Sequence, residues 1–255
     1  MMNSLYTAAT GMSAMQMNVD TIANNLANVN TNAFKATRLR FEDLLYQQVG
    51  DRQAARMGSQ NGMGVAPART ELAFSQGDLK DTGTLTHMAI DGAGFFQVTL
   101  PDGTIGYTRD GSFSVDQNGQ FVNASGYQLE PIVGLPLEAE PGSLQISPEG
   151  MITCKMNGVV EVLGELELAR FANPEGLAAL GSNVYAATVN SGEPIINAPG
   201  TNDMGLVKQG QLEGSNVSVM NEMVEMINAQ RAFESVSKVI STSDEMLGIA
   251  NSMRR

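Results

Sequence analysis

The sequence predicts an α+β fold in which long N- and C-terminal helices form a coiled-coil-like pair and carry an inserted, mainly antiparallel β domain. In the first thirty positions apolar residues recur in alternating steps of three and four, at Leu5, Ala8, Met12, Met15, Val19, Ile22, Leu26 and Val29. The same alternation closes the chain, at Met226, Ala229, Phe233, Val236, Ile240, Ser243, Leu247 and Ala250. Between these ends, period-two alternation and turn dipeptides prevail.

An average step of 3.5 residues places one narrow apolar stripe along a helix, which is typical of a coiled-coil seam. Each terminal helix therefore needs a partner helix. The partner can be the other helix of the same chain or a helix of a neighbouring copy, because both arrangements have the same heptad signature.

The chain divides by composition into four segments. Residues 1–35 are expected to form the N-terminal helix of a helical core domain and residues 215–255 its C-terminal helix. Residues 36–71 are expected to form an extended linker or bridging segment, since 46–69 is polar, rich in glycine and without a steady period. Residues 72–214 are expected to form a β-rich outer domain.

Two patterns predict the β domain. Val160, Val162, Leu166 and Leu168 alternate with glutamates, which predicts a strand with its apolar side chains inward and its carboxylates in water. Residue pairs that favour hairpin turns stand at Asp102-Gly103, Asp110-Gly111, Asn118-Gly119 and Asn157-Gly158.

Charge and composition exclude several classes of partner and binding site. A net charge of -12 in 255 residues argues against nucleic acid and anionic membranes as partners. No apolar run reaches the ~18 residues of a membrane span, so membrane insertion is not expected, and no cleaved secretory signal is evident. A single cysteine, Cys154, and a single histidine, His87, exclude an intramolecular disulfide and a multi-histidine zinc site. We expect no metal and no cofactor.

Catalytic motifs are weak. Gly92 and Gly94 lack the third glycine of a nucleotide loop, and Asp116 stands in only a fragment of a calcium loop. Glu165 with Glu167, or Asp110 with Asp116, could form a glycosidase acid pair, but solvated carboxylates are the default. We expect no catalytic residue and no enzymatic activity.

An asparagine-rich stretch ends the first apolar repeat. Asn24, Asn25 and Asn28 flank Leu26 and Val29 on the stripe. Amide side chains both donate and accept hydrogen bonds, and they can fix the register of packed helices. We interpret these three as interface-specifying residues.

Sequence blocks at both ends and in the middle resemble one family. Residues 7–12, 24–31 and 34–35 resemble the N-terminal signature of the bacterial flagellar rod and hook proteins. Residues 89–98, 101–104 and 107–113 look like the central block of that family. Its C-terminal block resembles residues 209–210, 212–213, 215–217, 229–234 and 237–240.

Three positions depart from the family pattern. Ala33 stands where the family commonly has glycine, so a positive φ is not expected there. Phe233 replaces a tyrosine and lacks its hydroxyl, and Ser218 replaces an aspartate but can still cap a helix.

The resemblance implies a structural subunit of the flagellar basal body, most like the distal rod member. Such a subunit self-assembles helically into a hollow drive shaft that transmits torque. The implied partners are further copies, proximal rod proteins, the hook protein, surrounding bushing rings where present, and the flagellar type III export apparatus. Export without a cleaved signal implies a periplasmic location in the cell envelope.

Three alternatives stay open. The nearest is another axial subunit, from the proximal rod or the hook. The others are a secreted enzyme that degrades cell wall and carries a coiled-coil stalk, and an adhesin-like β module on a helical stalk.

The expected subunit interface follows the two apolar repeats and the family blocks. Its residues are Leu5, Met12, Met15, Val19, Ile22, Asn24, Asn25, Leu26, Asn28, Val29, Phe34, Met226, Gln230, Arg231, Phe233, Val236, Ile240 and Leu247.

Overall fold

The computed structural model describes residues 2–44, 46–49, 59–136, 142–156 and 158–253. The chain forms two compact units. The helical unit comprises Met1–Ala27, Thr37–Leu72 and Ser218–Arg255, and the β unit comprises Asn28–Ala36 and Ala73–Val217. The backbone thus crosses between the units at 27/28, 36/37, 72/73 and 217/218.

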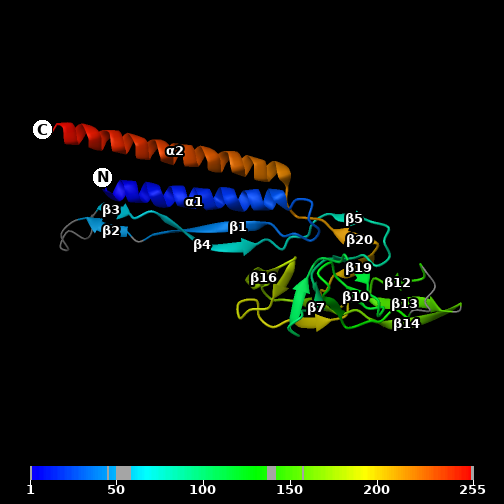
Figure 1. Cartoon of the computed structure of the whole chain (residues 1–255). Helices are drawn as coiled ribbons and strands as arrows, with labels where there is room; N and C mark the ends of the chain where they lie inside the picture. Colours follow the sequence, from blue (N-terminus) through cyan, green and yellow to red (C-terminus); the bar gives the residue numbers. More distant parts are fainter. Residues whose placement is uncertain (1, 45, 50–58, 137–141, 157, 254–255) are drawn as a thin grey trace. The chain divides into compact units, whose positions relative to one another are not determined.

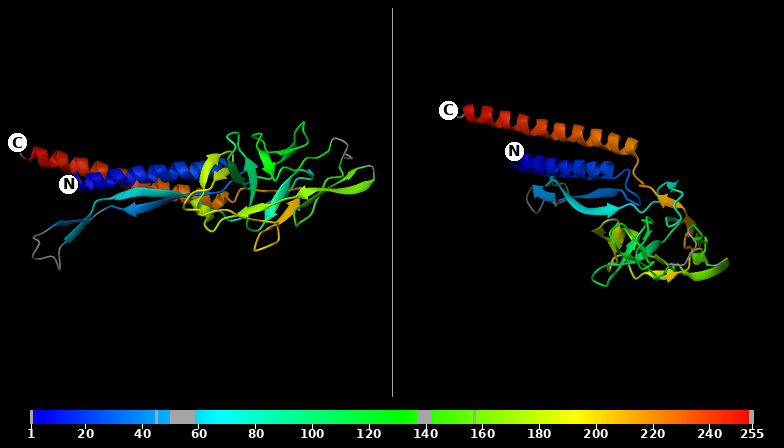
Figure 2. Two further views of the ribbon diagram at one scale, coloured as in Figure 1. Left: turned by 90° about the horizontal axis from the view of Figure 1, so that it is seen from below. Right: turned by 45° about the vertical axis from the view of Figure 1, so that its right-hand side comes forward.

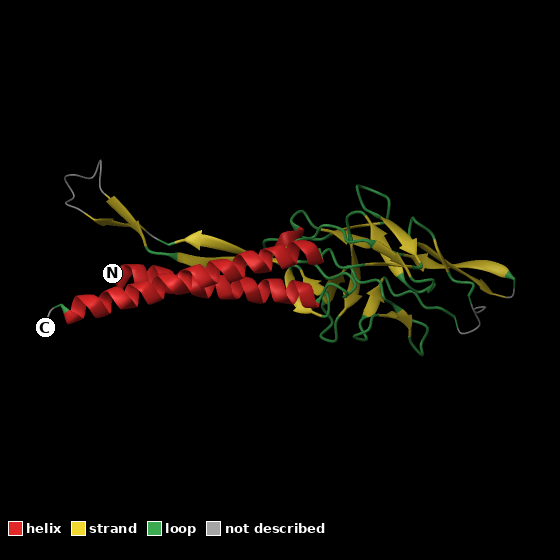
Figure 3. Cartoon of the chain, turned by 90° about the horizontal axis from the view of Figure 1, so that it is seen from above, coloured by secondary structure: helices red, strands yellow, loops and turns green. Residues whose placement is uncertain are grey.

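Two long helices dominate the helical unit. Helix α1 (Met2–Ala27) and helix α2 (Val219–Ser252) run antiparallel and side by side (Figures 1 and 3). Helices at both ends with a mainly antiparallel β region between them confirm that part of the predicted fold. No helix in the described part of the chain has the length and apolar character of a membrane span.

Helix α1 is covered on two adjacent faces, whereas its apolar repeat predicts one narrow stripe. The predicted stripe includes Ile22, which is 2% exposed. A neighbouring row of small and polar side chains is covered as well, with Ala14 at 0% and Asn25 at 2% exposure. Strands β1 (Thr37–Asp43) and β4 (Val65–Leu72) supply additional cover, because both contact α1.

Strands β1 and β4 pair in an antiparallel ribbon that lies alongside α1 (Figures 1 and 2). Their register runs from Thr37 opposite Leu72 to Asp43 opposite Val65, with a bulge between Arg40 and Phe41. Two short strands, β2 (Tyr46–Val49) and β3 (Ser59–Gly62), also pair with each other. The described residues of the expected linker thus form strands, and the alternation of Leu39 and Phe41 with arginines was the signal for β1.

Antiparallel pairing builds the β unit. Its largest sheet has nine strands in the order β16-β17-β8-β7-β11-β10-β9, with β15 on β7 and β18 on β15. These strands are β7 (Phe95–Thr99), β8 (Ile105–Thr108), β9 (Ser114–Val115), β10 (Phe121–Val122), β11 (Gln128–Glu130), β15 (Leu168–Arg170), β16 (Ala178–Gly181), β17 (Val184–Ala186) and β18 (Ile195–Asn197). A 3-10 turn spans Pro174–Gly176.

Three smaller sheets complete the unit, in the orders β12-β13-β14, β19-β6 and β20-β5. Their strands are β5 (Leu79–Asp81), β6 (Met88–Asp91), β12 (Gln145–Ile146), β13 (Met151–Met156), β14 (Val159–Glu165), β19 (Leu206–Gln209) and β20 (Gln211–Glu213). One core joins the sheets; it is built around Met88, Ile90, Phe96, Phe113, Phe121, Ile152, Leu166 and Leu168.

The turn dipeptides have different roles. Gly103 and Gly119 have φ of 79° and close the β7–β8 and β9–β10 hairpins, as predicted. Gly111 was wrongly predicted to form a hairpin turn. A Cβ at this position would collide with the carbonyl oxygen of Met88, so the glycine permits close backbone packing. Asn157 lies outside the described residues, and Gly158, with φ of 83°, follows it before β14.

The first half of strand β14 lacks the predicted buried face. Val160 and Val162 were expected inside, yet they are 66% and 58% exposed. The pairing of β13 with β14 slips by one residue between Ile152 and Thr153, which leaves Leu163 unpaired. Val159 and Glu161 on the other side of the strand are exposed as well, so the described residues cover neither face of β14 before the slip, whereas Leu166 beyond it is buried.

Ala33 contradicts the expectation that it avoids positive φ. Its φ is 55°, its side chain is fully buried, and its N–H donates to the carbonyl oxygen of Glu213 at 2.8 Å. A left-handed conformation costs an alanine about 1 to 2 kcal/mol, which the surrounding contacts offset.

Substituting glycine for Ala33 tests this strain. Ala33→Gly is expected to leave the free energy of unfolding unchanged or raise it by up to about 1 kcal/mol, since relief of strain exceeds the added entropy of the unfolded chain. Ala14→Gly, at an equally buried helical alanine, should lower it by about 1 kcal/mol. Denaturant unfolding of both variants provides the measurement. Equal losses of unfolding free energy would contradict the assignment of strain to Ala33.

Candidate functional site

The apolar repeats of the two helices meet within the helical unit. On α1, Leu5, Met12, Met15, Val19 and Leu26 are half-buried. On α2, Met226, Phe233, Val236 and Ile240 are half-buried, and Ala229 and Ser243 are buried. The side chain of Leu247 lies outside the described part of the chain. The described positions of both repeats are therefore at least partly shielded from solvent.

A groove of about 440 Å³ opens between the helices. Its walls are Gln16 and Val19 of α1 together with Gln230, Phe233 and Glu234 of α2. Val19 and Phe233, both predicted interface residues, thus come together at one place. Arg231 and Gln230 are exposed on α2.

A second apolar face of α2 points away from this packing. Its members share high exposure, from 82% for Met253 to 50% for Ile227. The face comprises Met220, Met223, Val224, Ile227, Val239, Met246, Ile249 and Met253. Sequence analysis missed it, although Met220, Val224 and Ile227 follow the same three-four spacing on the opposite side of the helix.

Among the three asparagines, Asn25 has a contact role that the structure defines. Its amide donates to Thr37 O at 2.9 Å and to Glu222 Oε2 at 3.2 Å, and its oxygen accepts from Thr37 N at 2.9 Å. Asn25 thereby joins α1 to both β1 and α2 inside one subunit. Asn24 is exposed and Asn28 is half-buried.

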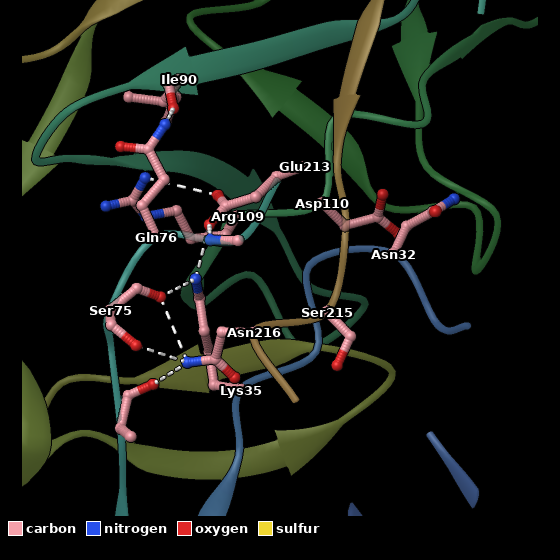
Figure 4. Close-up of polar contacts among 12 residues, drawn as sticks. Asn32, Lys35, Ser75, Gln76, Ile90, Arg109, Asp110, Glu213, Ser215 and Asn216 are labelled. Atoms are coloured by element: carbon pink, nitrogen blue, oxygen red, sulfur yellow. Dashed lines mark hydrogen bonds and ion pairs between the residues drawn. The ribbon is translucent and has the colours of Figure 1, made fainter. Parts of the chain in front are cut away.

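The β unit contains a buried polar junction (Figure 4). Lys35 Nζ lies 2.5 Å from Glu213 Oε1 and donates to Ser75 O at 2.8 Å. Arg109 NH1 lies 3.4 Å from Glu213 Oε2, and Arg109 NH2 donates to Gly92 O at 2.8 Å. The side chains of Lys35 and Glu213 are fully buried, and Arg109 is 5% exposed. Three segments far apart in sequence therefore meet at one carboxylate.

Asn216 closes the same junction (Figure 4). Its amide donates to Ala73 O at 2.7 Å and to Ser75 Oγ at 2.9 Å, while its oxygen accepts from Ala36 N at 2.8 Å. One side chain thus binds both the segment that precedes β1 and the segment that follows β4. Phe34, a predicted interface residue, is half-buried beside it and accepts from Asn216 N at 3.4 Å.

Burial sets the electrostatics of the junction. Desolvation lowers the pKa of Lys35 from its ordinary value, and the carboxylate of Glu213 limits this fall. Desolvation likewise lowers the pKa of Arg109, against the opposing attraction of Glu213. Burial, and then the charge of Glu213, raise the pKa of the nearby Tyr185 phenol to about 12. Two cations share one carboxylate here, so Glu213 holds the network together.

The residues considered for chemistry have structural roles. Asp116 accepts from the N–H groups of Asn118 and Gln120, and Asp110 accepts from that of Ser112. Glu165 and Glu167 are exposed. His87 Nδ1 lies 2.8 Å from Thr82 Oγ1, directly before β6, and Cys154 is buried in β13. Among the described residues, no cluster of three potential metal ligands occurs.

Comparisons with known proteins cover most of the chain. A model of flagella basal body rod proteins matches residues 5–35, one of the flagellar hook protein FlgE/F/G D1 domain matches 89–154, and one of the flagellar basal body rod FlgEFG C-terminal region matches 208–253. The chain is 49% identical to the flagellar basal-body rod protein FlgG of Borreliella burgdorferi, over 100% of both chains.

Two further relatives show how the sequence identity varies within the family. FlgG of Buchnera aphidicola subsp. Schizaphis graminum is 47% identical over 97% of this chain and 98% of its own. The flagellar basal-body rod protein FlgF of Mesorhizobium japonicum is 31% identical over 97% of each. The similarity is thus greater to these FlgG proteins than to this FlgF.

Removing the central carboxylate tests the junction. Glu213→Gln leaves two buried cations without their counter-charge and is expected to lower the free energy of unfolding by about 3 to 5 kcal/mol. Asp91→Asn, which breaks the half-exposed pair with Lys208, is the matched control and should cost no more than about 1 kcal/mol. Denaturant unfolding measures both, and similar small losses would argue against a stabilising role for Glu213.

The raised pKa of Tyr185 predicts a loss of stability in alkali. Between pH 10 and 12 the unfolded chain loses this phenolic proton while the folded chain retains it, so stability falls as pH rises. Tyr185→Phe should remove roughly 2 to 3 kcal/mol of that fall. Denaturant unfolding at both pH values provides the measurement. An unchanged pH dependence in the variant would refute the assignment.

Proposed function

Since the chain belongs to the flagellar basal-body rod and hook family and is a structural subunit of the rod, we propose that its helical unit drives helical self-assembly into the distal rod. The observation that carries this proposal is the exposed apolar face of α2. A monomer gains nothing by holding eight large apolar side chains in water, and such faces mark sites of association.

In this proposal the two sides of α2 have different tasks. The three-four repeat of α2 packs on α1 as a coiled-coil-like seam inside one subunit. The opposite face remains for a neighbouring copy. Burial of that face would contribute about 25 cal/mol for each Å² of apolar surface removed from water.

The groove between the helices offers a receptor for this face. Val19 and Phe233 provide apolar walls, and Gln16, Gln230 and Glu234 provide a polar rim. A contact between the outer face of α2 on one copy and the groove of the next is heterologous. Heterologous contacts that do not close into a ring generate an open helical assembly, which suits a hollow, torque-transmitting shaft.

The proposed partners follow from family membership. They are further copies, the proximal rod proteins, the hook protein and, where present, the bushing rings around the rod. Delivery by the flagellar type III export apparatus would place the subunit in the periplasmic part of the cell envelope. The β unit would form the outer wall, and the β1–β4 ribbon would bridge neighbours.

The relatives favour the distal rod over another axial subunit, because identity to the FlgG proteins is 47% to 49% and identity to the FlgF protein is 31%. A wall-degrading enzyme is disfavoured by the use of Asp110 and Asp116 as acceptors within turns. We therefore propose no catalytic role.

Charges on the outer face of α2 test the assembly site. Val224→Asp with Ile227→Asp should leave the helical content near normal, since both side chains are at least 50% exposed, but should abolish assembly and swimming. Val189→Asp, at a fully exposed valine of the β unit, is the matched control and should assemble. Sedimentation, electron microscopy and motility provide the readouts. Normal rods from the double variant would exclude this face as the assembly site.

A further inference from the structure

The β1–β4 ribbon carries a concentrated group of guanidinium side chains, here named the arginine face. Arg38 stands opposite Glu71 in the strand register, and Arg40 stands opposite Arg69. Alternate residues of a strand share a face, so all four side chains lie on one side of the ribbon. Together with Glu42, the next residue of that side of β1, this face contains three arginines and two carboxylates.

The arginines extend into solvent while the carboxylate of Glu71 lies beneath them. The side chains of Arg40 and Arg69 are 69% and 72% exposed, and that of Glu71 is 12% exposed. Arg40 Nε donates to Glu71 at 2.6 Å, and Arg69 pairs with the other oxygen of the same carboxylate. Hydrogen bonding from Arg40 lowers the pKa of Glu71, which therefore stays ionised at neutral pH.

The ion pairs with Glu71 leave an excess of positive charge on this face. Like charges directly opposite each other on neighbouring strands are destabilising, and Arg40 and Arg69 occupy such a pair. The register skips Ala68 of β4, so β1 alternates without a break and the exposed Glu42 continues the row of Arg38 and Arg40. The exposed guanidinium groups thus favour an anionic binding partner.

The chain itself offers a matching surface. The segments of the β unit contain 17 acidic and 6 basic residues, so they account for -11 of the net charge of -12. Exposed carboxylates of this unit include Asp81, Asp102, Glu161, Glu165 and Asp203. Guanidinium groups bind carboxylates with two parallel hydrogen bonds, which makes arginine well suited to such a contact.

We propose that the arginine face of the β1–β4 ribbon docks on carboxylates of the β unit of a second copy of this chain. The proposal rests on the self-assembly proposed above and supplies the chemistry by which the ribbon recognises its neighbour. A nucleic acid or an anionic lipid surface is a poorer partner, because the rest of the chain would repel it.

Salt dependence of assembly tests the charge contact. Arg38→Gln with Arg69→Gln should raise the protein concentration needed for assembly about tenfold at about 50 mM salt, and this effect should largely disappear at about 500 mM. The matched control is Lys80→Gln with Lys155→Gln, two exposed cations of the β unit, which makes the same change in net charge. It should not raise the required concentration. Equal effects of both pairs would overturn the proposal.

Cross-linking identifies the partner. Arg69→Lys provides an amine that a carbodiimide joins to a carboxylate in direct contact. The reaction is run on the concentrated full-length chain as an equal mixture of normal and nitrogen-15-labelled protein. Mixed-isotope cross-links from position 69 to an acidic residue of the β unit are expected. Cross-links confined to one copy, or none, would overturn the proposal.

The two proposals fail separately. If the Val224 and Ile227 double variant fails to assemble as expected while the arginine variants match their control, only the arginine face is wrong. If the helix variants assemble normally while the arginine variants show the salt effect, the outer face of α2 is wrong and the arginine face stands.

Discussion

The ionic contacts of Glu213 with Lys35 and Arg109 are the interaction on which the β unit depends. A carboxylate and two cations withdrawn from water are costly to bury, and their mutual attraction and hydrogen bonds offset that cost. The contacts also fix geometry, because Lys35 follows α1, Glu213 precedes α2 and Arg109 belongs to the central β region. Within the β unit, the junction therefore holds together the segment that follows α1 and the segment that precedes α2.

A polar junction suits this position better than an apolar one. Apolar side chains pack in many orientations, whereas hydrogen-bonded groups accept few. Asn216 and Asn25 also make directional hydrogen bonds, one on each side of the 36/37 crossing between the units. Asn216 bonds the backbone of Ala36 and Ala73, and Asn25 bonds that of Thr37. Where the chain passes between the units, side-chain amides thus form the backbone hydrogen bonds that a neighbouring strand would otherwise form.

Periodicity predicted the terminal helices and the antiparallel region, because each residue of a repeat reports directly on its local conformation. It failed where contacts with residues far away in the sequence determine the conformation or the burial. No described part of the chain covers either face of β14 at Val160 and Val162, and a hydrogen bond to Glu213 holds Ala33 at positive φ. The junction was equally hidden, since 178 positions separate Lys35 from Glu213. The family resemblance marked both residues without revealing their contact.

The backbone crosses between the two units at four places, and this topology has a mechanical consequence. A domain attached by one linker can swivel about single bonds at almost no cost. With four crossings, a twisting load divides among four covalent segments, and continued rotation must wind them around one another. In a rotating shaft, such a subunit would resist torsion through chain connectivity itself, in addition to any contact with its neighbours.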